Sequence, residues 1–132
     1  MEVPAELFAA AERGDLEAVR RCLRAGCDVN AADTRPLIGC GYTPLHYAAG
    51  ANHVELIRLL IRAGAAVDPG DVTGATPLWR ACNAGHLDAA RELLAVGADP
   101  NARNNDGYSC LGRVSAPHAE LAGLLRSYGA VI

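Results

Sequence analysis

The amino-acid sequence predicts an all-α solenoid in which four helix–turn–helix units stack in one row and form a single domain. Three observations support this: a segment recurs every 33 residues, apolar residues recur at helical spacing, and Gly or Asn separates the expected helices. The composition agrees, because 51% of the residues are hydrophobic but only 5% are aromatic, and much of the apolar content is Ala and Leu. Such a composition favours close-packed helices over a β-sandwich, which needs more β-branched and aromatic residues.

The repeat can be read directly from the sequence. The string GYTPLHYAA at 41–49 recurs as GATPLWRAC at 74–82 and, weakened, as GYSCL at 107–111. A second motif, GAAVD at 64–68, recurs as GADPN at 97–101, and its earlier copy GCDVN at 26–30 is displaced by 38 residues because five extra residues fall within 34–40. The expected divisions are repeat 1 at about 4–33, an insertion at 34–40, repeat 2 at about 41–73, repeat 3 at about 74–106 and repeat 4 at about 107–132.

Each unit carries its own start and stop signals. Thr43 and Thr76 are placed to cap a helix, and the Pro after each fits the first helical position, where no backbone N–H is needed. The turn inside a unit is expected at residues that tolerate left-handed dihedrals, namely Gly14, Asn52 and Gly85. The second helix of each unit is expected to end at a left-handed glycine, at Gly26, Gly64, Gly97 and Gly129.

These motifs resemble the ankyrin repeat. The resemblance rests on TPLH at 43–46, its variant TPLW at 76–79, GH at 85–86 and GAD at 97–99, and it covers roughly residues 4–132. It implies that the linking segments 28–41, 68–74 and 99–107 form hairpin-like loops at right angles to the helices. It also implies that His46 forms hydrogen bonds within its turn, and that partner proteins bind at the loop tips and on the concave face of the first helices.

The terminal units depart most from the pattern. The first lacks the Thr-Pro start, and the fourth is one residue short and has Gly112 where a helix former is expected. We interpret both as capping repeats, and we therefore expect a complete small protein rather than part of a longer array. The chain ends on Val131 and Ile132, which either pack onto the last helix or dock a partner or a second copy.

Matched position by position, the resemblance places candidate partner-binding residues on the loop tips and the inner face of the first helices, and the insertion adds Leu37 and Ile38 as a feature of this chain alone. Together the candidates are Arg13, Leu37, Ile38, Tyr42, Tyr47, Val72, Thr73, Arg80, Asn83, Arg103, Tyr108 and Arg113. Because Tyr and Arg are enriched at binding hot spots, the leading cluster is expected to be Tyr42, Tyr47, Arg80, Tyr108 and Arg113.

Two features leave alternatives open. In the insertion, Leu37 and Ile38 either fold back onto the loop or project as a finger toward a partner, since exposed apolar pairs in a loop tip usually need a reason. Trp79 stands where the second unit has His46. It either packs between repeats or leans into the concave face.

Several classes of function are disfavoured. A net charge of −3 gives no basic field that would attract nucleic acid. The five cysteines form no CxxC pair, and histidines at equivalent positions of successive units lie about one repeat apart, too far to share a metal ion. Cys82 and His86 lack an orienting third group, and no phosphate-binding loop is present. We therefore expect no enzyme, no cofactor and no metal site.

The N-terminus has neither a basic segment nor a long apolar run, so we expect a cytoplasmic protein that does not enter a membrane. The resemblance implies a non-catalytic module that binds another protein as a scaffold, adaptor or inhibitor. The alternative is a structural unit that self-assembles by stacking through its terminal repeats. We expect a monomer under the first interpretation and a homo-oligomer under the second.

Overall fold

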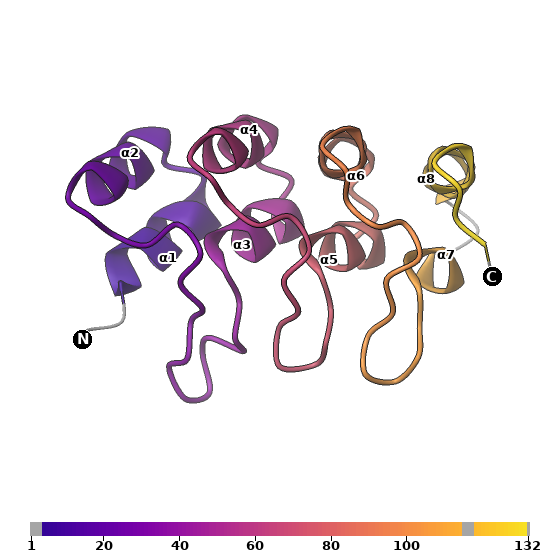
Figure 1. Cartoon of the computed structure of the whole chain (residues 1–132), viewed down its shortest axis with the longest axis horizontal. Coiled ribbons are helices and arrows are strands. Elements are labelled where there is room, and N and C mark those ends of the chain that lie inside the picture. The colour runs from indigo at the N-terminus through magenta and orange to yellow at the C-terminus, as the bar shows by residue number, and fades with distance from the viewer. Residues whose placement is uncertain (1–3, 115–117, 132) are drawn as a thin grey trace.

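The computed structural model describes residues 4–114 and 118–131. The helices of these residues form four antiparallel pairs in a row (Figure 1). The pairs are α1 (Ala5–Arg13) with α2 (Leu16–Arg24), α3 (Pro44–Gly50) with α4 (Val54–Arg62), α5 (Pro77–Asn83) with α6 (Leu87–Ala95), and α7 (Cys110–Arg113) with α8 (Ala119–Ser127). The expected fourth repeat includes residues 115–117 and 132, which lie outside the described residues.

The helices lie in two layers, with the loops on one side. The inner layer contains α1, α3, α5 and α7, the outer layer contains α2, α4, α6 and α8, and three loops project beyond the inner layer (Figure 1). α3 contacts both α1 and α5. Instead of strands, residues 4–114 and 118–131 contain two isolated antiparallel bridges, Asp33 with Tyr42 and Arg103 with Ser109. The all-α repeat solenoid predicted from the sequence is confirmed.

The predicted helix signals form local hydrogen bonds. Thr43 and Thr76 cap α3 and α5 by accepting from the backbone N–H of the third helical residue, and Ser109 does the same for α7. Asn52 adopts a left-handed φ of 60° at the turn between α3 and α4, where the first and third units have Gly14 and Gly85. Its side-chain Oδ1 also accepts from the N–H of Ala89 in the next unit. The turn therefore positions the second helix and ties it to its neighbour.

The core lies between the two layers and continues from unit to unit. Leu45, Leu60, Leu78 and Leu93 are fully or almost fully buried, and Ala81 is fully buried where the inner helices approach one another. A helix pair of this size cannot bury its apolar face alone, so stacking of neighbouring units supplies the core. Among the described residues, no helix has both the length and the apolar character required to cross a membrane.

The C-terminal end differs from one of the two expectations. α7 has only four residues, in agreement with a degenerate last unit. Val131 is 64% exposed, so the interpretation in which it packs onto the last helix is wrong for this residue. Ile132 lies outside the described residues. Tyr128 is 45% exposed at the end of α8, so the last unit presents apolar surface to solvent.

Candidate partner-binding face

Three side chains hold the same place on successive inner helices: Tyr47 on α3, Arg80 on α5 and Arg113 on α7. The Arg80 guanidinium lies 5.2 Å from the centre of the Tyr42 ring and 5.3 Å from the Trp79 ring. The Arg113 guanidinium lies 6.0 Å from the Trp79 ring and 5.3 Å from the Tyr108 ring. These distances are within the range of cation–π attraction.

The same series of contacts continues toward the N-terminus. The ring of Tyr42 meets that of Tyr47 edge to face, with 5.2 Å between the centroids, and Tyr47 lies 5.9 Å from Phe8. Arg35 lies 5.7 Å above the Phe8 ring. We call this continuous series of rings and guanidinium groups, from Arg35 and Phe8 to Arg113 and Tyr108, the aromatic–arginine ladder. It contains all five residues of the leading cluster.

A buried carboxylate in the first loop fixes one end of the ladder. Asp33 is fully buried, and its Oδ2 accepts from the Tyr47 hydroxyl at 2.7 Å and from Arg35 Nη2 at 2.6 Å. The hydrogen bonds from Arg35 hold the pKa of Asp33 below its usual value despite burial. Burial and the Asp33 carboxylate raise the pKa of Tyr47, so its hydroxyl remains a donor at neutral pH.

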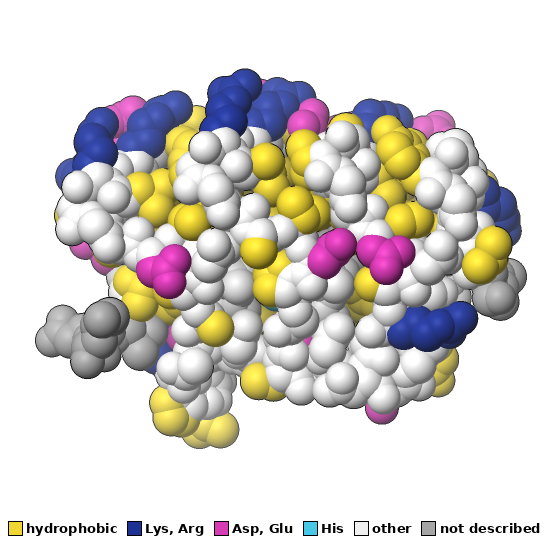
Figure 2. Space-filling model, in the orientation of Figure 1, with side chains coloured by type: hydrophobic (Ala, Val, Ile, Leu, Met, Phe, Trp, Pro, Cys, Tyr) yellow, Lys and Arg dark blue, Asp and Glu magenta, His cyan; other side chains and the backbone are white. Residues whose placement is uncertain are grey.

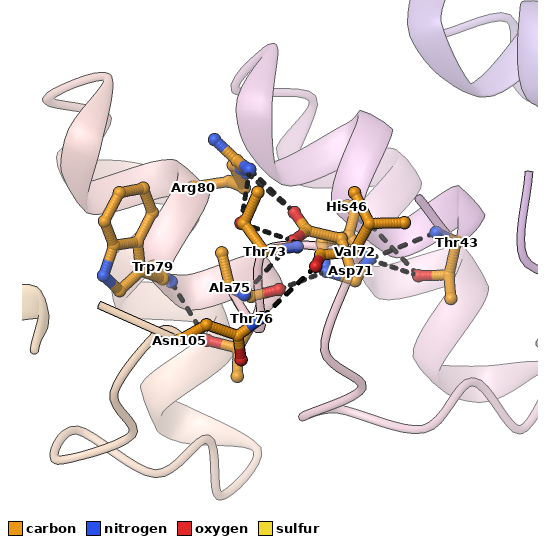
Figure 3. A network of polar contacts seen from close by, with 10 residues as sticks. All are labelled: Thr43, His46, Asp71, Val72, Thr73, Ala75, Thr76, Trp79, Arg80 and Asn105. Atoms are coloured by element: carbon orange, nitrogen blue, oxygen red, sulfur yellow. Dashed lines mark hydrogen bonds and ion pairs between the residues drawn. The ribbon is translucent and has the colours of Figure 1, made fainter. Parts of the chain in front are cut away.

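A second carboxylate fixes Arg80 in the same way (Figure 3). Asp71 Oδ2 accepts from Arg80 Nε at 2.9 Å, and Oδ1 accepts from the Thr73 N–H and hydroxyl at 2.8 and 2.7 Å. Burial alone would raise the pKa of Asp71. The hydrogen bonds from Thr73 and Arg80 have the larger combined effect, so the pKa of Asp71 lies below its ordinary value. Arg80 is therefore oriented by the loop, and its guanidinium lies over the Tyr42 ring.

His46 and Trp79 join each unit to the next. His46 Nδ1 accepts from the Thr43 N–H at 3.1 Å, so its Nε2 is the donor to the Ala75 carbonyl at 2.8 Å. Burial lowers the pKa of His46, which keeps the ring neutral. Trp79 Nε1 donates to the Tyr108 carbonyl at 3.0 Å, and the side chain is 6% exposed. Of the two alternatives for Trp79, packing between repeats is confirmed.

A shallow hollow of about 310 Å³ lies beside the ladder. It is lined by Tyr42, Tyr47 and Arg80 together with Asn83 and backbone from the ends of α3 and α5. Glu12 at the end of α1 also lines it and is not among the residues predicted from the sequence. The available signal was its place beside Arg13 at the end of the first helix, on the face expected to bind partners.

The remaining predicted residues lie around this face rather than in the hollow. Arg13 is exposed at the end of α1 and lies 3.5 Å from Asp15. Arg103 donates to the Gly107 carbonyl at 2.7 Å in the third loop. Val72 at the tip of the second loop is 67% exposed. These three residues do not contact one another through any hydrogen bond or ion pair of the described chain.

The insertion projects as a finger. Leu37 is fully exposed with a left-handed φ of 65°, and Ile38 is 64% exposed. Figure 2 shows hydrophobic side chains at the tip of this first loop. The interpretation in which the apolar pair folds back onto the loop is therefore wrong. The interior of the loop is already occupied, because the buried Gly39 packs against Asp33 so closely that a Cβ would collide with it.

The chemistry of the described residues does not point to catalysis. A hydrogen bond with Cys110 and burial raise the pKa of Cys82, so this thiol is poorly suited to act as a nucleophile. His86 Nε2 bonds to the Gly50 carbonyl. No cluster of three potential metal ligands occurs among residues 4–114 and 118–131. What the face does offer is a fixed arrangement of rings, one hollow and several side-chain donors.

Comparison with known proteins agrees with this architecture. The chain is 36% identical over 69 residues to human ankyrin repeat and SAM domain-containing protein 3, which is 52% of this chain and 10% of that protein. It is 35% identical over 65 residues to mouse 2-5A-dependent ribonuclease, which is 49% of this chain and 8% of that protein. The chain thus spans a tenth or less of the length of these relatives. A family profile described as ankyrin repeats in three copies matches residues 7–104, and the chain therefore belongs to the ankyrin-repeat family.

Proposed function

We propose that this protein is a non-catalytic recognition module that binds another protein through its inner face and loop tips. Ankyrin repeats generally mediate protein–protein interaction. The observation that carries the proposal is the aromatic–arginine ladder, which is continuous across the inner side of the stacked units. Tyr, Trp and Arg are the residues in which binding energy concentrates at protein interfaces.

The ladder is fixed before any partner arrives. Asp33 holds Tyr47 and Arg35, and Asp71 holds Arg80, through hydrogen bonds of 2.6–2.9 Å. Side chains that are already immobile lose little conformational entropy on binding, which favours affinity. A specific interface needs roughly 800 Å² on each partner, and a row of inner helices and loops can offer an area of that order.

In this proposal the twelve candidate residues contribute unequally. The exposed rings and guanidinium groups of the inner face supply the main contacts, and Asn83 supplies polar contacts beside the hollow. The finger adds Leu37 and Ile38 at the first loop, and Val72 adds a smaller apolar contact at the second. Binding without chemistry suits a cytoplasmic scaffold, adaptor or inhibitor, in which a partner is held or its surface covered.

A capture experiment with matched variants tests this proposal. The full chain is used as bait in a lysate of its host, in parallel with Tyr108→Ser on the inner face and Arg91→Gln on the outer helix α6. Tyr108 is 50% exposed, and within the described part of the chain Arg91 pairs with Asp88 alone, on its own helix, at 3.2 Å. The expected result is a protein retained by the wild type and Arg91→Gln but lost with Tyr108→Ser. Equal retention by all three baits would contradict binding at the inner face.

Self-assembly through the terminal units is the second candidate. It is supported by the exposed Tyr128 and Val131 at the C-terminal end of the stack. Sedimentation velocity at micromolar concentration separates the two possibilities. A dimer that Tyr128→Ser converts to a monomer would favour stacking of copies, whereas a monomer for the wild type would rule this candidate out at that concentration.

A further inference from the structure

Three loop residues occupy equivalent places in the fold: Asp33, Asp71 and Asn104. The backbone N–H of each donates to the carbonyl of the residue just before the next helix cap. The distances are 2.7 Å from Asp33 to Tyr42, 3.0 Å from Asp71 to Ala75 and 3.0 Å from Asn104 to Tyr108. The three loops therefore present the same side-chain position to the inner helix that follows.

The first side-chain oxygen has the same role in the last two loops. Asp71 Oδ1 accepts from the backbone N–H of Thr73 and Ala75, and Asn104 Oδ1 accepts from Asp106 and Tyr108 at 3.1 and 3.0 Å. The second terminal atom of the side chain differs between Asp71 and Asn104. In Asp71 it is an oxygen that accepts from Arg80, whereas in Asn104 it is an amide nitrogen, which can only donate.

This single difference leaves Arg113 without the carboxylate that Arg80 has. Arg113 holds on α7 the place of Arg80 on α5, and its side chain lies over Trp79 and Tyr108. Among residues 4–114 and 118–131, no carboxylate lies within ion-pair distance of its guanidinium. Because Arg113 is exposed, its charge is directed toward solvent on the proposed binding face.

We propose that Arg113 is a carboxylate-binding position, which takes the side chain of an Asp or Glu from a protein segment that crosses the inner face. The inference rests on the proposed function and names the chemistry of the partner. A guanidinium is a planar fork of donors that matches a carboxylate in two parallel hydrogen bonds. The rings of Trp79 and Tyr108 orient the fork. Trp79 is buried, so the half-exposed Tyr108 ring provides the apolar surface for a residue beside the acid.

A peptide segment fits this position better than a nucleic-acid backbone. A nucleic acid requires several uncompensated cations in a row, and its affinity comes from neutralising many phosphates. On the ladder, Arg35 and Arg80 are already paired with Asp33 and Asp71, and the chain as a whole carries a net charge of −3. One uncompensated guanidinium between two rings suits one acidic side chain with apolar neighbours.

Selection from a phage-displayed library of random peptides tests the proposal directly. The full chain is the target, and the enriched peptides are synthesised with each Asp or Glu in turn replaced by Asn or Gln. Binding is followed by the fluorescence of Trp79, the single tryptophan of the chain, whose ring lies 6.0 Å from the Arg113 guanidinium. We expect enriched peptides to share an acidic residue whose neutralisation weakens binding about tenfold or more, since charge-assisted bidentate pairs are strong.

Three variants separate the inference from its alternatives. Arg113→Gln is expected to weaken the acidic peptide about as much as neutralising the peptide does, with little further loss when both changes are combined. Asn104→Asp is expected to weaken it as well, although Arg113 is still present, because the new carboxylate occupies the guanidinium as Asp71 does for Arg80. Arg91→Gln on the outer helix is expected to bind like the wild type.

Each other outcome overturns a defined part of the argument. Peptides that need Tyr108 but contain no required acidic residue, or that bind Arg113→Gln as well as wild type, overturn the carboxylate position and leave the proposed function intact. A library that yields no peptide dependent on the inner face counts against both. Tighter binding of a dodecamer of deoxythymidine than of any selected peptide would assign the site to nucleic acid instead. Thermal melting of each variant confirms that the fold is retained.

Discussion

The second and third helical units each bond to the unit that follows them, but through different side chains. Both begin with a Thr cap and a Pro, and both must bond to the unit that follows. His46 in the second unit donates to the Ala75 carbonyl at 2.8 Å, and Trp79 in the third donates to the Tyr108 carbonyl at 3.0 Å. The bond between units therefore belongs to the position on the helix, and either an imidazole or an indole N–H can supply it.

The two units differ in what else this position does. His46 also accepts from the Thr43 N–H, which completes a capping box at the start of α3. Trp79 has no acceptor nitrogen, so α5 lacks this second bond, but its larger ring carries the guanidinium groups of Arg80 and Arg113. At this position the second unit therefore makes two polar bonds, whereas the third makes one and adds packed aromatic surface.

Replacing Trp79 by Ala should have the largest effect on this comparison. The change removes a buried indole, its hydrogen bond to Tyr108 and the support of two arginines, so we expect a loss of about 3–5 kcal/mol in the free energy of unfolding. Urea unfolding followed by circular dichroism provides the measurement, with Arg91→Gln as the control. A smaller loss of unfolding free energy in Trp79→Ala than in His46→Ala would contradict the importance of packing around Trp79.

Replacing His46 by Ala should cost less, about 1–3 kcal/mol, because the main loss is a pair of buried hydrogen bonds. The Thr43 N–H and the Ala75 carbonyl would each lose a partner in a site that excludes water. The same urea titration measures the effect. An effect within the error of the control would mean that water enters the site and replaces the ring.

The two units should also differ in their response to pH. Burial holds the pKa of His46 in the folded chain below its ordinary value of 6.5, so the unfolded chain takes up the proton first. This contribution to stability is present above about pH 6.5 and is lost progressively as the pH falls through that value. The gap in unfolding free energy between wild type and His46→Ala should therefore narrow from pH 7.5 to pH 5. Trp79→Ala retains His46 and should keep the pH dependence of the wild type.

The smallest expected effect on stability concerns the loops that precede the two units. Replacing both Leu37 and Ile38 by Ser should change the unfolding free energy by no more than about 0.5 kcal/mol, because both side chains are exposed. Partner affinity, measured by titration calorimetry once the partner is captured, should weaken. Val72→Ser in the shorter second loop is the matched variant, with a smaller expected effect. Unchanged affinity in the double variant would remove the finger from the interface.

The fold was predictable because its signals are local. Thr43, Thr76 and Ser109 cap the helices that were expected to start there, and Asn52 takes the expected left-handed turn. Each of these outcomes follows from a side chain that acts on backbone a few residues away. Repetition of the same signals at a spacing of 33 residues then predicts stacking.

The arrangement of the candidate site was predictable only in part. The inner-face position of Tyr47 and Arg80 follows from the repeat, but the hydrogen bonds that their side chains make to the carboxylates of Asp33 and Asp71 do not. Asp33 reaches Tyr47 across a loop that contains the insertion, and no spacing rule describes an insertion. The outward direction of Leu37 likewise depends on Gly39 occupying the space beside Asp33, which is a matter of packing. Whether the twelve candidate residues bind a partner stays a prediction.

The close contact between Gly39 and Asp33 has a practical consequence for the finger. The base of the loop is held by Arg35, Gly39 and Gly41, whose backbone bonds to one another and to Asp33 do not involve the side chains at the tip. The tip sequence can therefore be exchanged while its anchor remains, provided that the residue at position 37 tolerates a left-handed φ. Residues 36–38 form a ready grafting site, where foreign recognition sequences could be displayed on this small scaffold without redesign of its core.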